Sequence, residues 1–202
     1  MYRLFAVRNG LAAAGRLHPV AKEQERISAN EILLLLVCGA VSASVIAFVR
    51  LGLRLPGHSI VLSMFPMALG LALAPRRLGG FIMSAGAFAT AAAYTGAGLA
   101  QYGSGAFVSL CLLGPMMDLA LTKVRGGVRL YASFVLAGIA TNIMALASRS
   151  TSKLLMIDPG TRPFGGWWTQ AIMTYSLCGA LAGLIAALCF FHFRSRQSAD
   201  SE

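Results

Sequence analysis

Few residues of this chain could do chemistry, and two of them lie in or beside apolar sequence. His58 follows a Pro-Gly turn in the stretch Leu55–Ser59, between two long apolar runs, and Asp118 is the one acidic residue within an apolar run. Each residue allows two interpretations. His58 either contacts a substrate or reaches water at a membrane interface. Asp118 either forms a structural pair with a nearby Lys or Arg, or is a proton or ion site.

No enzyme signature accompanies these residues. Gly103-Ser-Gly105 only partly matches the motif of intramembrane serine proteases, because the residue that precedes Ser there is missing and no His lies in a facing span. A lone carboxylate cannot supply an acid/base pair or a carboxylate-rich metal site. The phosphate-binding motif of ATPases is absent. We therefore predict a protein that is not an enzyme and carries no cofactor.

The cysteines do not suggest metal or redox chemistry. All four lie inside apolar runs, without Cys-x-x-Cys spacing and without a His nearby in sequence. A free Cys in such a place usually packs as a small apolar residue. They are Cys38, Cys111, Cys178 and Cys189. We predict no metal site.

Composition places these residues in a membrane. Of 202 residues, 57% are apolar and only 12% are charged, and the mean hydropathy is +0.71. A soluble domain carries about 25% charged residues, so this chain lacks the polar side chains to cover a surface in water. Its apolar stretches are even rather than alternating, which favours helices over a transmembrane barrel.

Six stretches approach the roughly 20 apolar residues that cross a bilayer. The predicted spans are residues 32–49, 59–75, 78–100, 104–122, 129–147 and 168–191. We expect an all-α bundle of six transmembrane helices within residues 31–193. Residues 1–30 would form a basic cytoplasmic leader and residues 194–202 a cytoplasmic tail.

The positive charge carries topological information. Cytoplasmic connections of membrane proteins collect Lys and Arg, and 12 of the 17 basic residues lie before the first span, in the second and fourth connections and in the tail. The first and fifth connections hold the other five, among them Arg54 and Arg149, and the third connection holds none. Both termini are therefore expected in the cytoplasm of a multi-pass protein of the plasma or inner membrane. Membrane topology thus accounts for the net charge of +10, and we predict no nucleic-acid partner.

Small residues recur at every fourth position of the first predicted span, at Gly39, Ala43 and Ala47. This spacing lines one helical face and allows a close approach by another helix. The approaching helix could belong to this bundle or to a partner protein. Further along the chain, Asn142 either hydrogen-bonds a neighbouring helix or contacts a substrate. Trp167 and Trp168 either anchor the chain at the interface or form an aromatic wall.

Six spans in about 200 residues, both termini inside, the Pro56-Gly57 turn after the first span and a long fifth connection form a recognisable pattern. The pattern resembles the S components of energy-coupling factor transporters, which capture vitamins or metals within the membrane. Ala43 and Ala47 look like the Ala-x-x-x-Ala face by which such subunits dock on a shared T component. The subgroup that captures nickel and cobalt has an N-terminal metal-binding His, and His18 in the charged leader does not match it.

The resemblance implies a ligand pocket near the outer face, under the first, third and fifth connections. The positions that would reach it are His58, Ser59, Tyr94, Gln101, Tyr102, Asn142, Trp168 and Gln170. These are mostly neutral hydrogen-bonding and aromatic groups, which suit a small, largely uncharged, vitamin-like molecule. The T component and the ATPase subunits would come from other chains.

Other classes of protein remain open. A non-catalytic scaffold or assembly protein would have no outward pocket, and Trp167 and Trp168 would face lipid. An intramembrane enzyme would need Asp118, His58 or Ser104 to converge, although Asp118 is predicted near the opposite face. A channel or self-sufficient carrier more often shows two related halves, and no internal repeat is evident.

Overall fold

The computed structural model describes residues 27–49, 57–74, 78–123, 127–155 and 168–199. Every regular element in these ranges is a helix. They are α2 (Ala29–Phe48), α3 (Ser59–Leu73), α4 (Gly79–Gly96), α5 (Ser104–Lys123), α6 (Gly127–Leu154) and α7 (Trp168–Ala199). The all-α prediction is therefore confirmed for the described residues. Most of the leader and the turn residue Pro56 lie outside them.

Four helices are long and apolar enough to cross a membrane, namely α2, α5, α6 and α7, which indicates a membrane protein. The sequence predicted six spans. The helix α3 has only 15 residues, or about 22 Å at 1.5 Å per residue, against a hydrocarbon thickness of about 30 Å. The helix α4 ends at Gly96, and Gly98 then adopts a φ of +70°, so it is shorter than the predicted span 78–100.

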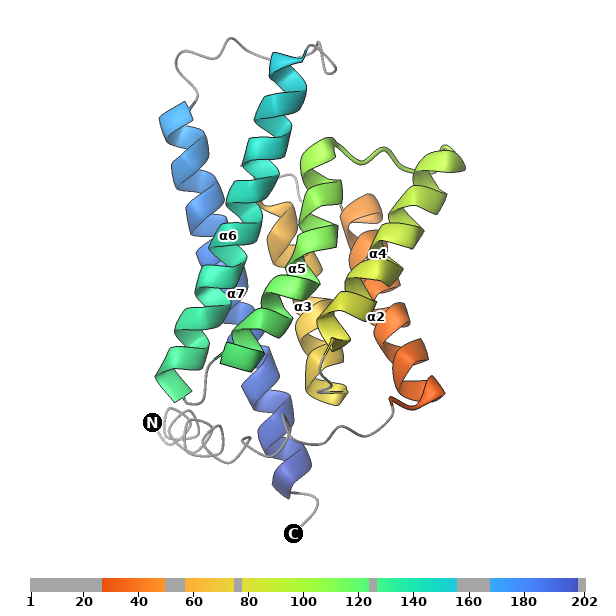
Figure 1. Ribbon diagram of the computed structural model, residues 1–202, viewed down its shortest axis with the longest axis vertical. Helices are drawn as coiled ribbons and strands as arrows, with labels where there is room; N and C mark the ends of the chain where they lie inside the picture. The colour runs from red at the N-terminus through yellow and green to blue at the C-terminus, as the bar shows by residue number, and fades with distance from the viewer. Residues whose placement is uncertain (1–26, 50–56, 75–77, 124–126, 156–167, 200–202) are drawn as a thin grey trace.

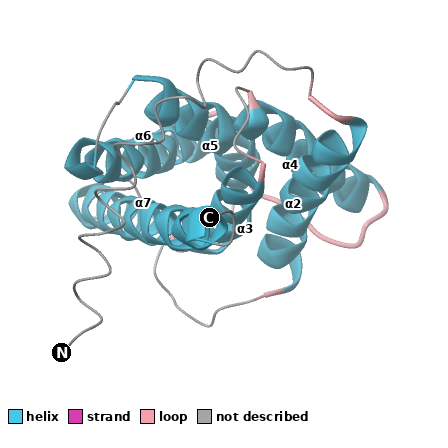
Figure 2. Cartoon of the chain, turned by 90° about the horizontal axis from the view of Figure 1, so that it is seen from below, coloured by secondary structure: helices cyan, strands magenta, loops and turns pink. Residues whose placement is uncertain are grey.

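The described helices alternate in direction (Figure 1). At the end of the bundle that we call the Tyr94 end, α2, α4 and α6 finish and α5 and α7 begin. At the opposite end, called the Asp118 end, α2, α4 and α6 begin and α3, α5 and α7 finish. Neighbours around the bundle follow the order α2, α4, α5, α6, α7, α3 and back to α2 (Figure 2). Because α3 closes this ring against α7, it contacts residues far along the chain.

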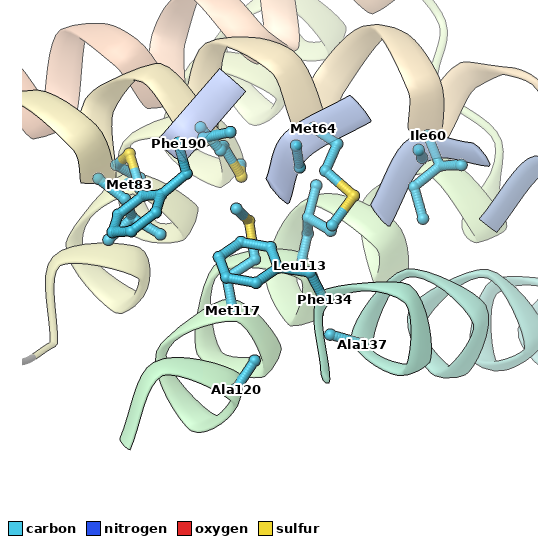
Figure 3. Packing of buried hydrophobic residues seen from close by; sticks show 14 of the residues in the cluster. Ile60, Met64, Met83, Leu113, Met117, Ala120, Phe134, Ala137 and Phe190 are labelled. Atoms are coloured by element: carbon cyan, nitrogen blue, oxygen red, sulfur yellow. The ribbon is translucent and has the colours of Figure 1, made fainter. Parts of the chain in front are cut away.

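The apolar core lies mainly around α3 and the half of the bundle nearer Asp118. Figure 3 shows side chains from α3, α4, α5, α6 and α7 meeting there: Met64, Met83, Leu113, Met117, Phe134 and Phe190. The rings of Phe134 and Phe190 have centroids 5.9 Å apart. Between α6 and α7 toward the Tyr94 end, the core continues only as a separate cluster of Ala145, Leu146, Ala171 and Tyr175.

Candidate functional site

Asn142 joins three helices at the Tyr94 half of the bundle. Its side chain is 1% exposed. Its Nδ2 donates one hydrogen bond of 2.7 Å to the carbonyl oxygen of Tyr175 in α7 and another of 3.3 Å to the carbonyl oxygen of Gly57, just before α3. Asn142 lies 12 residues before the end of α6, or about 18 Å by helical rise. The start of α3 is therefore held part of the way down the bundle.

Tyr175 packs directly on this helix start. Gly57 has a φ of +86°, a backbone conformation that favours glycine. A Cβ atom there would also lie only 3.0 Å from Cγ of Tyr175, so the ring would have to shift. The phenol oxygen of Tyr175 accepts a hydrogen bond of 3.4 Å from Nη1 of Arg149. Gly57, Asn142, Tyr175 and Arg149 thus form one connected polar group, which we call the Asn142 cluster.

A second polar group lies on the other side of the Tyr94 end. The hydroxyl of Tyr94 is 3.0 Å from Oγ of Ser44, and the ring of Tyr94 makes an edge contact with Phe48. The hydroxyl of Tyr102 donates to the carbonyl oxygen of Ala43 at 2.9 Å. Partial burial, and secondarily the nearby Tyr94, raises the pKa of Tyr102 above its ordinary value. Its phenol therefore keeps the proton that it donates.

The other predicted site residues lie at the margins of these groups. His58 is the N-cap residue of α3, and Ser59 is the first residue of that helix; both are half-buried. Gln101, Trp168 and Gln170 are exposed, with Trp168 at 37%. The structure thus brings Asn142 to the start of α3 and sets Tyr94 and Tyr102 against α2. It does not bury Gln101, Trp168 and Gln170 with either group.

Asp118 lies at the opposite end and caps a helix. Its two carboxylate oxygens each accept a hydrogen bond of 2.9 Å, from the backbone N–H groups of Gly80 and Phe81. These are the second and third residues of α4, whose N–H groups have no partner within the helix. Leu78 at the N-cap has no side-chain oxygen to supply. Asp118 therefore acts as the N-cap of α4 from a neighbouring helix. The expected pairing with Lys123 or Arg125 stays a prediction, because those two side chains lie outside what the structure describes.

Glycines bring the two helices together for this capping. A Cβ atom at Gly80 would collide with the backbone of Gly114, and one at Gly114 would collide with the backbone of Gly80. Ser84 adds a hydrogen bond of 3.0 Å, which its hydroxyl accepts from the N–H of Gly114. Asp118 is one helical turn beyond Gly114, so the close contact places its carboxylate at the start of α4.

The small-residue face of the first span is used within the chain. Gly39 packs so closely on α4 that a Cβ atom would collide with the backbone of Met83, and Ala43 is fully buried. Packing inside the bundle, one of the two alternatives, therefore holds for Gly39 and Ala43. Their predicted role at a partner interface stays a prediction. Ala47 is half-buried, and its predicted role stays a prediction.

Sequence reasoning did not identify Tyr175 and Ser44 as site residues. Ser44 is one small polar residue among several in its helix, and nothing local marks its contact with Tyr94. A signal for Tyr175 does exist. It follows Ala171 at the helical spacing of four, which predicts that the two residues share one helical face. In the structure both are buried in the same cluster with Ala145 and Leu146 of α6.

The comparisons with known proteins add no relative. No family model, curated protein or solved structure matches this chain.

Proposed function

We propose that this protein is the membrane-embedded substrate-capture subunit of an importer of the energy-coupling factor type. It binds a small, largely uncharged, vitamin-like molecule at the Tyr94 end, which faces away from the cytoplasm. All six helices lie in the cytoplasmic membrane with both termini inside. A T component and ATPase subunits from other chains supply the energy.

The observation that carries the proposal is the position of Asn142. Its hydrogen bonds hold the start of α3 part of the way down the bundle, and in the proposed six-helix arrangement this backbone end lies at membrane depth. Such backbone is tolerated only where protein buries it or where it lines a water-filled space. Helices that begin within the membrane frame the substrate sites of several transporter folds. The buried apolar residues between α6 and α7 at this end form a small cluster separate from the main core, which supports the same location.

The residue types near this helix start support the proposed substrate. The polar side chains at the Tyr94 end are phenols, hydroxyls and an amide, with Arg149 as the charged member of the Asn142 cluster. Few, well placed polar groups among apolar and aromatic side chains are typical of small-molecule sites.

A scaffold or assembly function is the second candidate, and one observation favours it. Trp168 is 37% exposed at the start of α7, where an aromatic side chain serves as a membrane anchor. On this alternative the Asn142 cluster only fastens α3 to α6 and α7. The two functions differ in whether the protein binds a small molecule.

The experiment is to purify the tagged full chain from its native membranes and to identify the proteins that remain bound. In parallel, the thermal stability of the purified chain is measured across a panel of vitamins. Copurified ATPases with a T component, together with a stability shift by at least one compound, support the proposal. A tagged unrelated membrane protein from the same membranes gives the background. If no partner proteins copurify and no compound shifts the thermal stability, the scaffold function is favoured.

A further inference from the structure

Arg149 carries a positive charge to the interior side of α6. Its Cβ lies 3.7 Å from the position that a Cβ atom of Gly105 in α5 would take, and its Nη1 reaches the hydroxyl of Tyr175 in α7. Tyr175 is itself 4% exposed. The side chain of Arg149 therefore runs between α5 and α7 instead of outward to lipid, and a guanidinium there loses part of its hydration.

No carboxylate within the described ranges neutralises this charge. Those ranges contain two acidic residues, Glu31 and Asp118. Glu31 lies in the first turn of α2 and accepts from the backbone of Ser28, and Asp118 caps α4. Both belong to the Asp118 end, whereas Arg149 lies in the last turns of α6 at the Tyr94 end. A partly buried charge that finds no counter-charge among these described residues is costly there, and a bound anion would lower that cost.

The start of α3 adds a second positive feature on the same side. The N-terminus of a helix carries a partial positive charge and N–H groups without helical partners. The N-cap residue His58 makes no side-chain capping bond. Gly57 touches the ring of Tyr175, and the hydroxyl of that ring accepts from Arg149. The start of α3 and the guanidinium are thus placed near the two ends of one tyrosine side chain.

A buried hydroxyl on α6 points to a missing partner. Oγ1 of Thr141 is fully buried and forms no hydrogen bond within the described residues. Thr141 is one helical turn before Ala145 and two before Arg149, and the last two both lie against Gly105 of α5. Because residues four apart share a helical face, Thr141 lies on the same side of α6 as Arg149, about 12 Å further along the helix by its rise. An unsatisfied buried hydroxyl costs free energy, and a ligand oxygen would remove that cost.

We propose that the captured molecule, otherwise uncharged, carries one carboxylate, which the guanidinium of Arg149 binds between α5, α6 and α7. Tyr175 positions the guanidinium, the start of α3 adds favourable electrostatics, and Thr141 offers a hydrogen bond to the opposite end of the same ligand. This inference rests on the proposed function, because it names the substrate class of that site. Arginine pairs with a carboxylate through two parallel hydrogen bonds. One guanidinium balances one negative charge, whereas a phosphate ester would bring nearly two.

The test uses matched acids and amides as probes. The full chain is purified in detergent, and equilibrium binding is measured for nicotinate and nicotinamide, biotin and biotinamide, and lipoate and lipoamide. We expect at least one acid to bind about 10- to 100-fold more tightly than its amide, because a hydrogen bond to a charged group is worth more than a neutral one. Arg149→Met should abolish this preference. Arg129→Met, an exposed arginine at the Asp118 end, should keep it.

A second variant protects the test against misfolding. Tyr175→Phe keeps the ring on Gly57 and removes only the hydroxyl that holds Arg149, so affinity for the acid should fall about three- to tenfold while the amide is unaffected. If acid and amide bind equally, or Arg149→Met keeps the preference, the inference is wrong and the capture function stands. If neither form of any pair binds, both are wrong. Phosphatidylglycerol vesicles supply an anionic lipid as a further probe. If Arg149→Met changes only the extent to which these vesicles raise the thermal stability of the protein, the anion is a lipid headgroup and the inference is overturned.

Discussion

Nδ2 of Asn142 lies 2.7 Å from the carbonyl oxygen of Tyr175, so one amide ties the middle of α6 to α7. Asn142→Asp keeps the shape of the side chain, removes both donated hydrogen bonds and turns negative charge toward two carbonyl oxygens. We expect a loss of about 2 kcal/mol or more in the free energy of unfolding. Reversible unfolding in mixed micelles measures this loss.

The matched control is the same exchange at an exposed position. Asn30→Asp lies in the first turn of α2, where a negative charge is favourable beside a helix N-terminus, so stability should stay the same or rise slightly. Equal effects of the two exchanges would show that the hydrogen bonds of Asn142 do not stabilise the bundle.

The capping of α4 by Asp118 gives a second prediction. Asp118→Asn retains one acceptor but removes the charge and turns an NH2 group toward one of the two N–H groups. Loss of a helix cap and its charge costs about 1–2 kcal/mol. Thermal denaturation should reveal that loss, and Leu119→Met, an exposed neighbour, should leave the melting temperature unchanged. An unchanged Asp118→Asn variant would mean that this cap contributes nothing to stability.

These two contacts illustrate what could be predicted from sequence. The starts of α3, α5 and α7 agree with prediction to within a residue, because glycines, prolines and apolar runs mark helix boundaries locally. The partner of Asp118 was not predictable in this way. Lys123 and Arg125 are near in sequence, whereas Gly80 is 38 residues away, and only the contact between α4 and α5 brings it close. Likewise, the spacing of small residues on the face containing Gly39 would be the same whether that face packs on α4 or on another protein, so the sequence does not distinguish the two.

Close packing of α4 on α5 gives a third prediction. A Cβ atom at Gly114 would collide with the backbone of Gly80, and backbone cannot move aside as a flexible side chain can. Gly114→Ala should therefore cost about 1–3 kcal/mol through overpacking and should also disturb the cap that Asp118 provides.

Gly96 is the matched control for Gly114. A Cβ atom there would meet nothing within 4 Å, and its φ is not positive. Gly96→Ala should be neutral or should stabilise by up to about 1 kcal/mol. Urea or detergent denaturation of the two alanine variants, measured side by side, tests the contact. Equal stability of the Gly114→Ala and Gly96→Ala variants would contradict the close contact between α4 and α5.

The central claim is that the Tyr94 end faces away from the cytoplasm, and cysteine labelling in intact cells tests it most directly. Gln101 is exposed at that end, and Val128 is 74% exposed at the Asp118 end. In a background without the four native cysteines, Gln101→Cys should react with a membrane-impermeant maleimide from outside, and Val128→Cys should react only after permeabilisation. The reverse pattern would place the Asn142 cluster toward the cytoplasm and contradict capture from outside.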